Sequence, residues 1–133
     1  MLQVKTKIGI SKIHGIGLFA DQFIPKGTVT FLYIPWYDIS FSKKDFDKMT
    51  NVAKEQMLWF TYFNKKLDKF ILCGDNQRFI NHSNNPKKIN IESTPDKDVA
   101  LRDIQIGEEL LCDYNKFDDT YFERMGYKKE NLK

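Results

Sequence analysis

The sequence predicts one mostly-β or α+β domain, and three features support this prediction. Short apolar or β-branched runs recur between turn signals, which is typical of short strands. A single longer segment, residues 43–60, has the periodicity of a helix. The chain has 133 residues, of which 41% are hydrophobic, and this suits one domain with one core. We therefore expect a single domain over residues 1–133.

Three extended segments, residues 4–10, 18–20 and 28–34, are predicted in the first third of the chain. Residues 4–10 alternate in polarity and include β-branched side chains, so we expect a strand there. Gly15 and Gly17 interrupt this pattern, and extended structure resumes after them. Residues 24–27, Ile-Pro-Lys-Gly, form a turn signal that leads into the strongest predicted strand, residues 28–34.

The predicted helix covers residues 43–60. Ser42 and Asp45 have the spacing of a capping box at its start. Apolar side chains then recur every three or four residues and form one stripe, made of Phe46, Met49, Ala53, Met57 and Phe60. A stripe of this kind usually packs against a core, and we predict that role for it.

The second half of the chain predicts further strands and one short helix. The strands are expected at residues 69–73, 89–92, 99–101 and 108–114. The last of them follows a turn at residues 104–107 that repeats the Ile-x-x-Gly pattern of the earlier turn. A weak helix should follow, capped by Asp118 or Asp119 and ended by Gly126.

Charge and cysteine content exclude several kinds of protein. The net charge of +3 comes from 21 basic and 18 acidic residues, and only three of the basic residues are Arg. Arg is preferred for phosphate and base contacts, so we expect no direct nucleic-acid binding. A lysine-rich nucleic-acid-binding protein is the alternative, and its DNA affinity would depend steeply on salt.

The two cysteines also argue against a metal site. Cys73 and Cys112 each follow a Leu, which predicts buried thiols, and no known ligand spacing joins them to His14 or His82. The first residues contain no long apolar run. We therefore expect no signal peptide, no membrane anchor and an intracellular location.

Three polar segments could carry chemistry. In His14-Gly15-Ile16-Gly17 two glycines beside a strand let the backbone approach a ligand. Residues 78–83, Arg-Phe-Ile-Asn-His-Ser, run from an apolar pair into hydrogen-bonding side chains. Residues 109–114 end a predicted strand with Asp113 and Tyr114. Each segment alone is more often a turn, a helix cap or a packing element.

Taken in this order, the three segments resemble the SET-domain family of protein lysine methyltransferases. The glycine pair resembles the family's first motif, residues 78–83 its Asn-His-Ser motif, and residues 107–114 its Glu-Leu-x-x-Asp-Tyr motif. The resemblance spans about residues 4–116. It implies a β-clip-like fold of small sheets with a knot-like crossing, one helical insert at residues 43–60 and a short C-terminal segment at residues 117–133.

The resemblance also implies an activity. The chain would be an S-adenosylmethionine-dependent protein-lysine N-methyltransferase, with Tyr114 as the catalytic tyrosine. Asn81 would bind the donor's amino group, and the main chain of His82 would contact its adenine. The residues expected at the donor are His14, Gly15, Ile16, Gly17, Asn81, His82 and Tyr114. The alternative is a non-catalytic SET-like binding module.

For the substrate channel the resemblance implies Tyr62, Cys112 and Phe117. Tyr33 and Tyr37 are alternatives to Tyr62 as a second channel tyrosine. Many members have Phe or Tyr at the position of Cys112, so the smaller thiol predicts products with two or three methyl groups.

The C-terminal segment lacks the cysteine-rich zinc-binding tail of many members. Phe117, Tyr121 and Phe122 could close the channel with aromatic rings instead. The expected partner is a protein or peptide that carries a lysine, a histone being one candidate. We expect a cytoplasmic location, or a nuclear one if the substrate is a histone.

Overall fold

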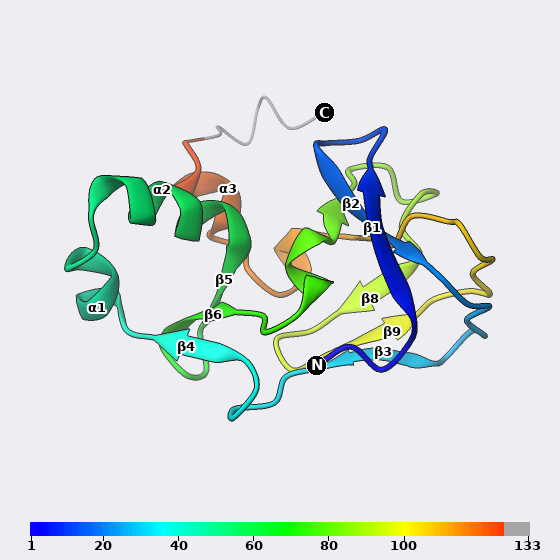
Figure 1. Cartoon of the computed structure of the whole chain (residues 1–133), viewed down its shortest axis with the longest axis horizontal. Helices are drawn as coiled ribbons and strands as arrows, with labels where there is room; N and C mark the ends of the chain where they lie inside the picture. Colours follow the sequence, from blue (N-terminus) through cyan, green and yellow to red (C-terminus); the bar gives the residue numbers. More distant parts are fainter. Residues whose placement is uncertain (127–133) are drawn as a thin grey trace.

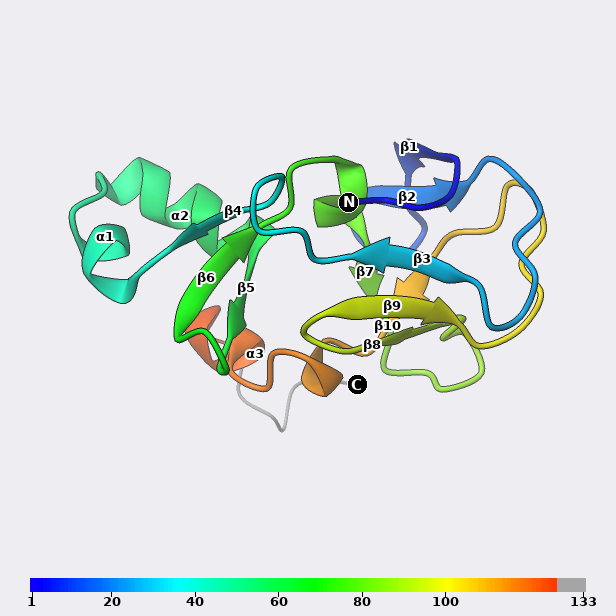
Figure 2. The ribbon, with the colours of Figure 1, turned by 90° about the horizontal axis from the view of Figure 1, so that it is seen from below.

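Small sheets and short helices make up residues 1–126, the residues that the computed structural model describes (Figures 1 and 2). Residues 127–133 of the predicted C-terminal segment lie outside the described residues. The helical insert stands at one end of the molecule in Figure 1, and β1, β2, β3, β8 and β9 stand at the other. This arrangement confirms the predicted mostly-β architecture.

The first hairpin presents the glycine segment. β1 (Thr6–Ile10) and β2 (Ile16–Ala20) pair antiparallel, with Ile10 opposite Ile16 at the end of the hairpin. The connecting loop holds Gly15 at a φ of +48°, a conformation that glycine adopts without steric cost. The prediction of two extended segments separated by the glycine pair is confirmed, although Gly17 lies within β2.

A second sheet contains most of the strong strand predictions. Its strand order is β3–β9–β8, formed by Val29–Leu32, Lys97–Ala100 and Ile91–Ser93. Both pairings are antiparallel, and a register irregularity lies between Val29 and Phe31. The predicted strands are confirmed with boundaries shifted by a few residues.

The third sheet carries the helical insert. Its order is β4–β6–β5, with strands Ile39–Phe41, Lys69–Leu72 and Thr61–Asn64. The prediction of one helix over residues 43–60 is wrong, because two helices form, α1 (Lys43–Asp47) and α2 (Asn51–Phe60). Thr50 is extended, and its hydroxyl accepts from the Ala53 N–H as the N-cap of α2.

The apolar stripe of the insert is only half-buried. No side chain of α1 or α2 is fully buried, although Phe46 stacks on Phe70 of β6 at 5.0 Å between ring centroids. Phe60 meets Phe79 edge-on at 5.6 Å. The predicted core role is therefore wrong in part, because the stripe covers Phe70 on the central strand β6 and lines the wall of a cavity.

The fourth sheet joins segments far apart in sequence. β7 (Asn81–His82) and β10 (Leu111–Cys112) pair in parallel. The Asn90 side chain holds β10 in place through two hydrogen bonds. Its Nδ2 donates to the Glu109 carbonyl at 2.8 Å, and its Oδ1 accepts from the Leu111 N–H at 2.8 Å. The crossing thus brings the Asn-His-Ser segment beside the last strand. The 3₁₀ helix η1 (Asn76–Phe79) leads into β7.

After β10 the chain forms η2 (Tyr114–Lys116) and α3 (Tyr121–Arg124). The helix predicted near the C-terminus exists, but the N-cap is Thr120 and no side chain caps it. Asp118, the predicted cap, is buried instead. Each of its two carboxylate oxygens accepts a hydrogen bond of 2.9 Å from the Arg124 guanidinium. Its second oxygen also accepts from the Phe63 N–H, so α3 is held against β5.

The main core lies between the first two sheets and the crossing. Its buried members are Leu18, Ala20, Ile24, Ile80, Ile91, Ala100, Ile104, Leu110 and Cys112. Burial of these side chains removes apolar surface from water and stabilises the fold. Within residues 1–126 no helix has the length and apolar character needed to cross a membrane.

Candidate active site

The sequence-predicted donor residues meet at a cavity of about 450 Å³, a size typical of small-molecule sites. Its wall is formed by His14, Gly15, Ile16, Trp59, Phe60, Arg78, Phe79, Asn81, His82, Tyr114, Tyr121 and Phe122. The glycine loop, the crossing, the end of α2 and the C-terminal helix therefore share one cavity. Six of the seven predicted donor residues line it.

Asn81 connects the glycine loop to the crossing. Its Nδ2 donates to the carbonyls of His14 and Ile16 at 3.0 and 3.2 Å, and to Glu109 Oε1 at 3.0 Å. Glu109 also accepts from the Ser11 hydroxyl at 3.0 Å. The amide of Asn81 therefore fixes the position of the backbone that lines the cavity.

Gly17 is the predicted donor residue that lies outside the cavity wall. Its role is steric, because a Cβ added at Gly17 would lie 2.2 Å from Glu109 Oε1 and 2.9 Å from Glu109 Cδ. Only glycine lets this carboxylate approach the hairpin closely enough to hold Asn81.

Replacing Gly17 with Ala should therefore disturb the whole network. We expect the free energy of unfolding to fall by about 1–3 kcal/mol, since Glu109 must move away from Asn81. Thermal unfolding measures this effect. Gly9→Ala is the matched control in the same hairpin, where the nearest atom to the added Cβ is a ring carbon of Phe19 at 3.3 Å. Equal unfolding temperatures for Gly17→Ala and the unsubstituted chain would contradict the assignment.

His82 holds the start of η2. Its Nδ1 accepts from the Tyr114 N–H at 3.0 Å, so the ring proton must be on Nε2. Nε2 lies 2.5 Å from Asn84 Oδ1, which accepts that proton's hydrogen bond. The imidazole therefore positions Tyr114, and it meets the Phe122 ring edge-on at 4.8 Å between centroids.

Tyr114 lies where two cavities meet. Besides the larger cavity, it lines a smaller one of about 50 Å³. Its hydroxyl donates to the Ile80 carbonyl. Burial raises the pKa of Tyr114 well above its usual value, and the nearby thiol of Cys112 acts in the same direction. The phenol is therefore protonated at neutral pH and acts as a hydrogen-bond donor.

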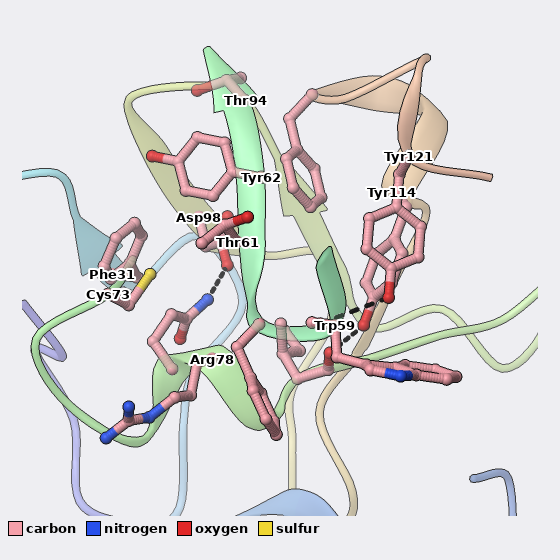
Figure 3. Close-up of a pocket in the computed structure, with 14 residues that line it drawn as sticks. Phe31, Trp59, Thr61, Tyr62, Cys73, Arg78, Thr94, Asp98, Tyr114 and Tyr121 are labelled. Atoms are coloured by element: carbon pink, nitrogen blue, oxygen red, sulfur yellow. Dashed lines mark hydrogen bonds between the residues drawn. The ribbon is translucent and has the colours of Figure 1, made fainter. Parts of the chain in front are cut away.

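The smaller cavity is lined by aromatic and polar side chains from both halves of the chain (Figure 3). Phe117 meets Tyr62 at 5.4 Å and Tyr114 at 5.7 Å between centroids, both edge-on. The Tyr62 hydroxyl points away from Tyr114 in Figure 3 and donates to the Pro95 carbonyl at 3.0 Å. Tyr62 and Phe117, both expected in a substrate channel, thus line one cavity with Tyr114.

The third predicted channel residue, Cys112, is not at either cavity. Its side chain is fully buried in the main core, and its thiol points to the Asn81 carbonyl at 3.9 Å. Cys112 therefore lines neither of the two cavities, so the structure gives no support to its expected place in the channel or to extra space beside the substrate nitrogen. Tyr33 and Tyr37, the alternatives to Tyr62, line neither cavity.

Several residues that line the cavities lie outside the three sequence motifs. Trp59 and Phe60 end α2 and line both cavities, and Trp59 stacks on His14 at 5.3 Å between centroids. Gln77 and Asp98 line the smaller cavity. The helical periodicity predicts that Phe60 lies on an apolar stripe. The local sequence does not indicate, however, that any of these four side chains lines a cavity.

Metal chemistry has no candidate ligands in the described part of the chain. Among residues 1–126, no group of three or more His, Cys, Asp or Glu side chains could hold a metal ion. Cys73 and Cys112 are buried thiols, and burial raises the pKa of each.

Comparison with known sequences identifies relatives. The histone-lysine N-methyltransferase trr of Drosophila melanogaster is 34% identical over an alignment of 113 residues that covers 81% of this chain. The matched region is 5% of that protein, so the chain spans a small part of its relative.

Solved structures share the fold. ctPRC2 in an autoinhibited conformation bound to S-adenosylmethionine matches with a TM-score of 0.67 and 20% identity, covering 92% of this chain and 16% of that one. The Chaetomium thermophilum Polycomb Repressive Complex 2 bound to GSK126 matches at 0.65 and 19%, covering 92% and 17%. A family model described as the SET domain matches residues 15–115. The chain therefore belongs to the SET-domain family.

Proposed function

We propose that the chain is a protein-lysine N-methyltransferase that uses S-adenosylmethionine. One observation supports this most strongly: Tyr114 lies in the wall that a ligand-sized cavity shares with a narrow aromatic one. A methyl donor in the larger cavity and a lysine in the smaller one would meet beside its hydroxyl. The Drosophila relative is named as a histone-lysine methyltransferase, which agrees with this reaction.

The larger cavity suits the donor chemically. The amino-acid end needs hydrogen-bond acceptors for an ammonium group, and the glycine loop offers the carbonyls of His14 and Ile16, which Asn81 orients. The adenine needs apolar and aromatic surface, which Trp59 and Phe122 supply on the same wall. When bound, the donor supplies an electrophilic methyl group attached to a sulfonium.

This chain's own residues would act by positioning. Methyl transfer is an in-line displacement, so most of the rate gain comes from holding the lysine nitrogen in line with the methyl group. Tyr62, Phe117 and Tyr114 would exclude water around the lysine, and a dry aromatic surface disfavours its ammonium form. The Tyr114 phenol stays protonated and donates its proton to the Ile80 carbonyl, so its oxygen would accept a hydrogen bond from the lysine amine and orient it.

The substrate class follows from the smaller cavity and the relative. A narrow aromatic opening admits a long unbranched side chain such as lysine. The relative acts on a histone by its name, and we propose a lysine of a histone or of another basic protein as the substrate. A histone substrate would place the activity in the nucleus.

Asn81→Ala tests the donor site. We expect S-adenosylmethionine to bind more weakly by about 1–3 kcal/mol, since the His14 and Ile16 carbonyls and Glu109 lose their common donor. Calorimetry measures the affinity, and thermal unfolding shows whether the variant is folded. Asn85→Ala, an exposed loop asparagine outside both cavities, is the matched control. Unchanged affinity in folded Asn81→Ala would remove Asn81 from the site.

A non-catalytic SET-like binding module is the second candidate, and one experiment separates it from an enzyme. The chain is incubated with isotope-labelled S-adenosylmethionine and a mixture of histones and other basic proteins. An enzyme transfers label to protein and a binding module does not, although both bind the donor in calorimetry. A protein that binds neither donor nor substrate would contradict both candidates.

A further inference from the structure

A buried carboxylate lines the cavity proposed to receive the lysine. Asp98 lies on β9, opposite Phe31 of β3 and Ser93 of β8, and is 4% exposed. Gln77 Nε2 donates to Asp98 Oδ2 at 2.6 Å, and both side chains line the smaller cavity together with Tyr114 (Figure 3). Burying a carboxylate is costly, so its position beside this cavity requires an explanation.

Asp98 is the only carboxylate among the described residues of that wall. Tyr62, Cys73 and Tyr114 line the same wall, and burial raises the pKa of each. These groups are therefore protonated at neutral pH and cannot accept another proton. Arg78 lies on the same wall, with its guanidinium over the Phe79 ring and away from Asp98 in Figure 3.

We propose that Asp98 accepts the proton that the substrate lysine must lose before methyl transfer. The lysine N–H bond breaks, its electron pair stays on nitrogen, and the proton bonds to an Asp98 oxygen directly or through water in the cavity. The neutral amine then attacks the methyl group, and Asp98 releases its proton to solvent before the next turnover. This inference rests on the methyltransferase function proposed above.

The acidity of Asp98 suits this role. Burial raises the pKa of Asp98 to about 7, and the hydrogen bond from Gln77 opposes the rise. The positive amino group of Met1 also lowers the pKa of Asp98. Tyr62, Cys73 and Cys112 face Asp98 from other elements and are neutral at pH 7. A proton acceptor works best with a pKa near the working pH.

The raised pKa also predicts a cost in stability. An acid whose folded pKa lies above its unfolded value stabilises the fold below about pH 4, and that contribution is lost as pH rises through about 7. Asp98→Asn should therefore unfold at a higher temperature than the unsubstituted chain at pH 8, and this gain should shrink at pH 5. A carboxylate kept only for structure would give the opposite result.

Asp98→Asn tests the proposal with S-adenosylmethionine and a basic-protein substrate. We expect turnover at pH 7.5 to fall by about 100-fold, donor affinity to stay unchanged, and the rise in kcat/KM through about pH 7 to disappear. Asp96→Asn, which removes an exposed carboxylate two residues away, is the control and should keep wild-type kinetics. If Asp98→Asn does not fold, Gln77→Leu decides, because losing its hydrogen bond should move the rise to higher pH.

The outcomes are distinguishable. A wild-type chain that transfers no methyl group overturns the proposed function itself. A wild-type chain that transfers methyl groups, with Asp98→Asn equal to it in turnover and pH profile, overturns only the role of Asp98. Loss of turnover with an unchanged pH profile and lower stability at pH 8 also overturns that role, because it marks a structural carboxylate.

Discussion

Tyr114→Phe is expected to lower methyl-transfer turnover by about 100-fold or more while the chain stays folded and binds S-adenosylmethionine. Loss of a single hydrogen-bonding group at reacting atoms commonly has an effect of this size. The ring keeps its contacts with Tyr121 at 4.8 Å and His82 at 5.3 Å between centroids, so packing should survive. The Ile80 carbonyl loses its donor, which should cost about 1–3 kcal/mol of stability.

The measurement is single-turnover transfer from labelled donor, with donor affinity determined in parallel. Tyr33→Phe serves as the control, because it removes a tyrosine hydroxyl that lies outside both cavities. Wild-type turnover in Tyr114→Phe would refute the catalytic assignment.

Arg124→Met should have the largest effect on stability and should also weaken donor binding. The guanidinium makes two hydrogen bonds of 2.9 Å to the Asp118 carboxylate, which is 1% exposed, so its removal leaves a buried charge unpaired. Breaking such a pair costs about 3–5 kcal/mol. The same pair holds α3, whose Tyr121 and Phe122 line the donor cavity, in place.

Chemical denaturation and calorimetry with S-adenosylmethionine measure the two effects. The control is Lys65→Met, which breaks an ion pair of 2.6 Å to Asp119 in the same region. Because both of those side chains are more than half exposed, the cost should be at most about 1 kcal/mol. If Arg124→Met matched Lys65→Met in stability and in donor affinity, α3 would not be held by this pair.

Strands with strong local signals could be predicted from the sequence. β3 and β9 contain β-branched residues after turn signals, and their positions agree with the expectation within a few residues. β4 and β7 could not be predicted, because three and two residues are too few for a periodic pattern and pairing with distant strands defines them. The break between α1 and α2 depends on Thr50, which caps α2. The apolar periodicity continues across this residue and therefore does not indicate the break.

The wall of the larger cavity could be predicted in part, because several of its residues belong to contiguous motifs. His14, Asn81 and His82 lie at one cavity, as the resemblance implied. The smaller cavity depends on contacts between distant elements, so Asp98 and Gln77 gave no signal in the sequence. The burial of Cys112 in the main core could not be predicted, because its place two residues before Tyr114 does not reveal which way its side chain faces.

Mass spectrometry of a lysine-bearing substrate tests the central claim most directly. Histones are incubated with the chain and excess S-adenosylmethionine, and the proteins are analysed for methyl groups on individual lysines. We predict methylation of a defined lysine that depends on the donor, is absent when that lysine is replaced by arginine, and is nearly lost with Tyr114→Phe. A chain that binds the donor, yet adds no methyl group to any lysine of histones or of a wider set of basic proteins, would contradict the account.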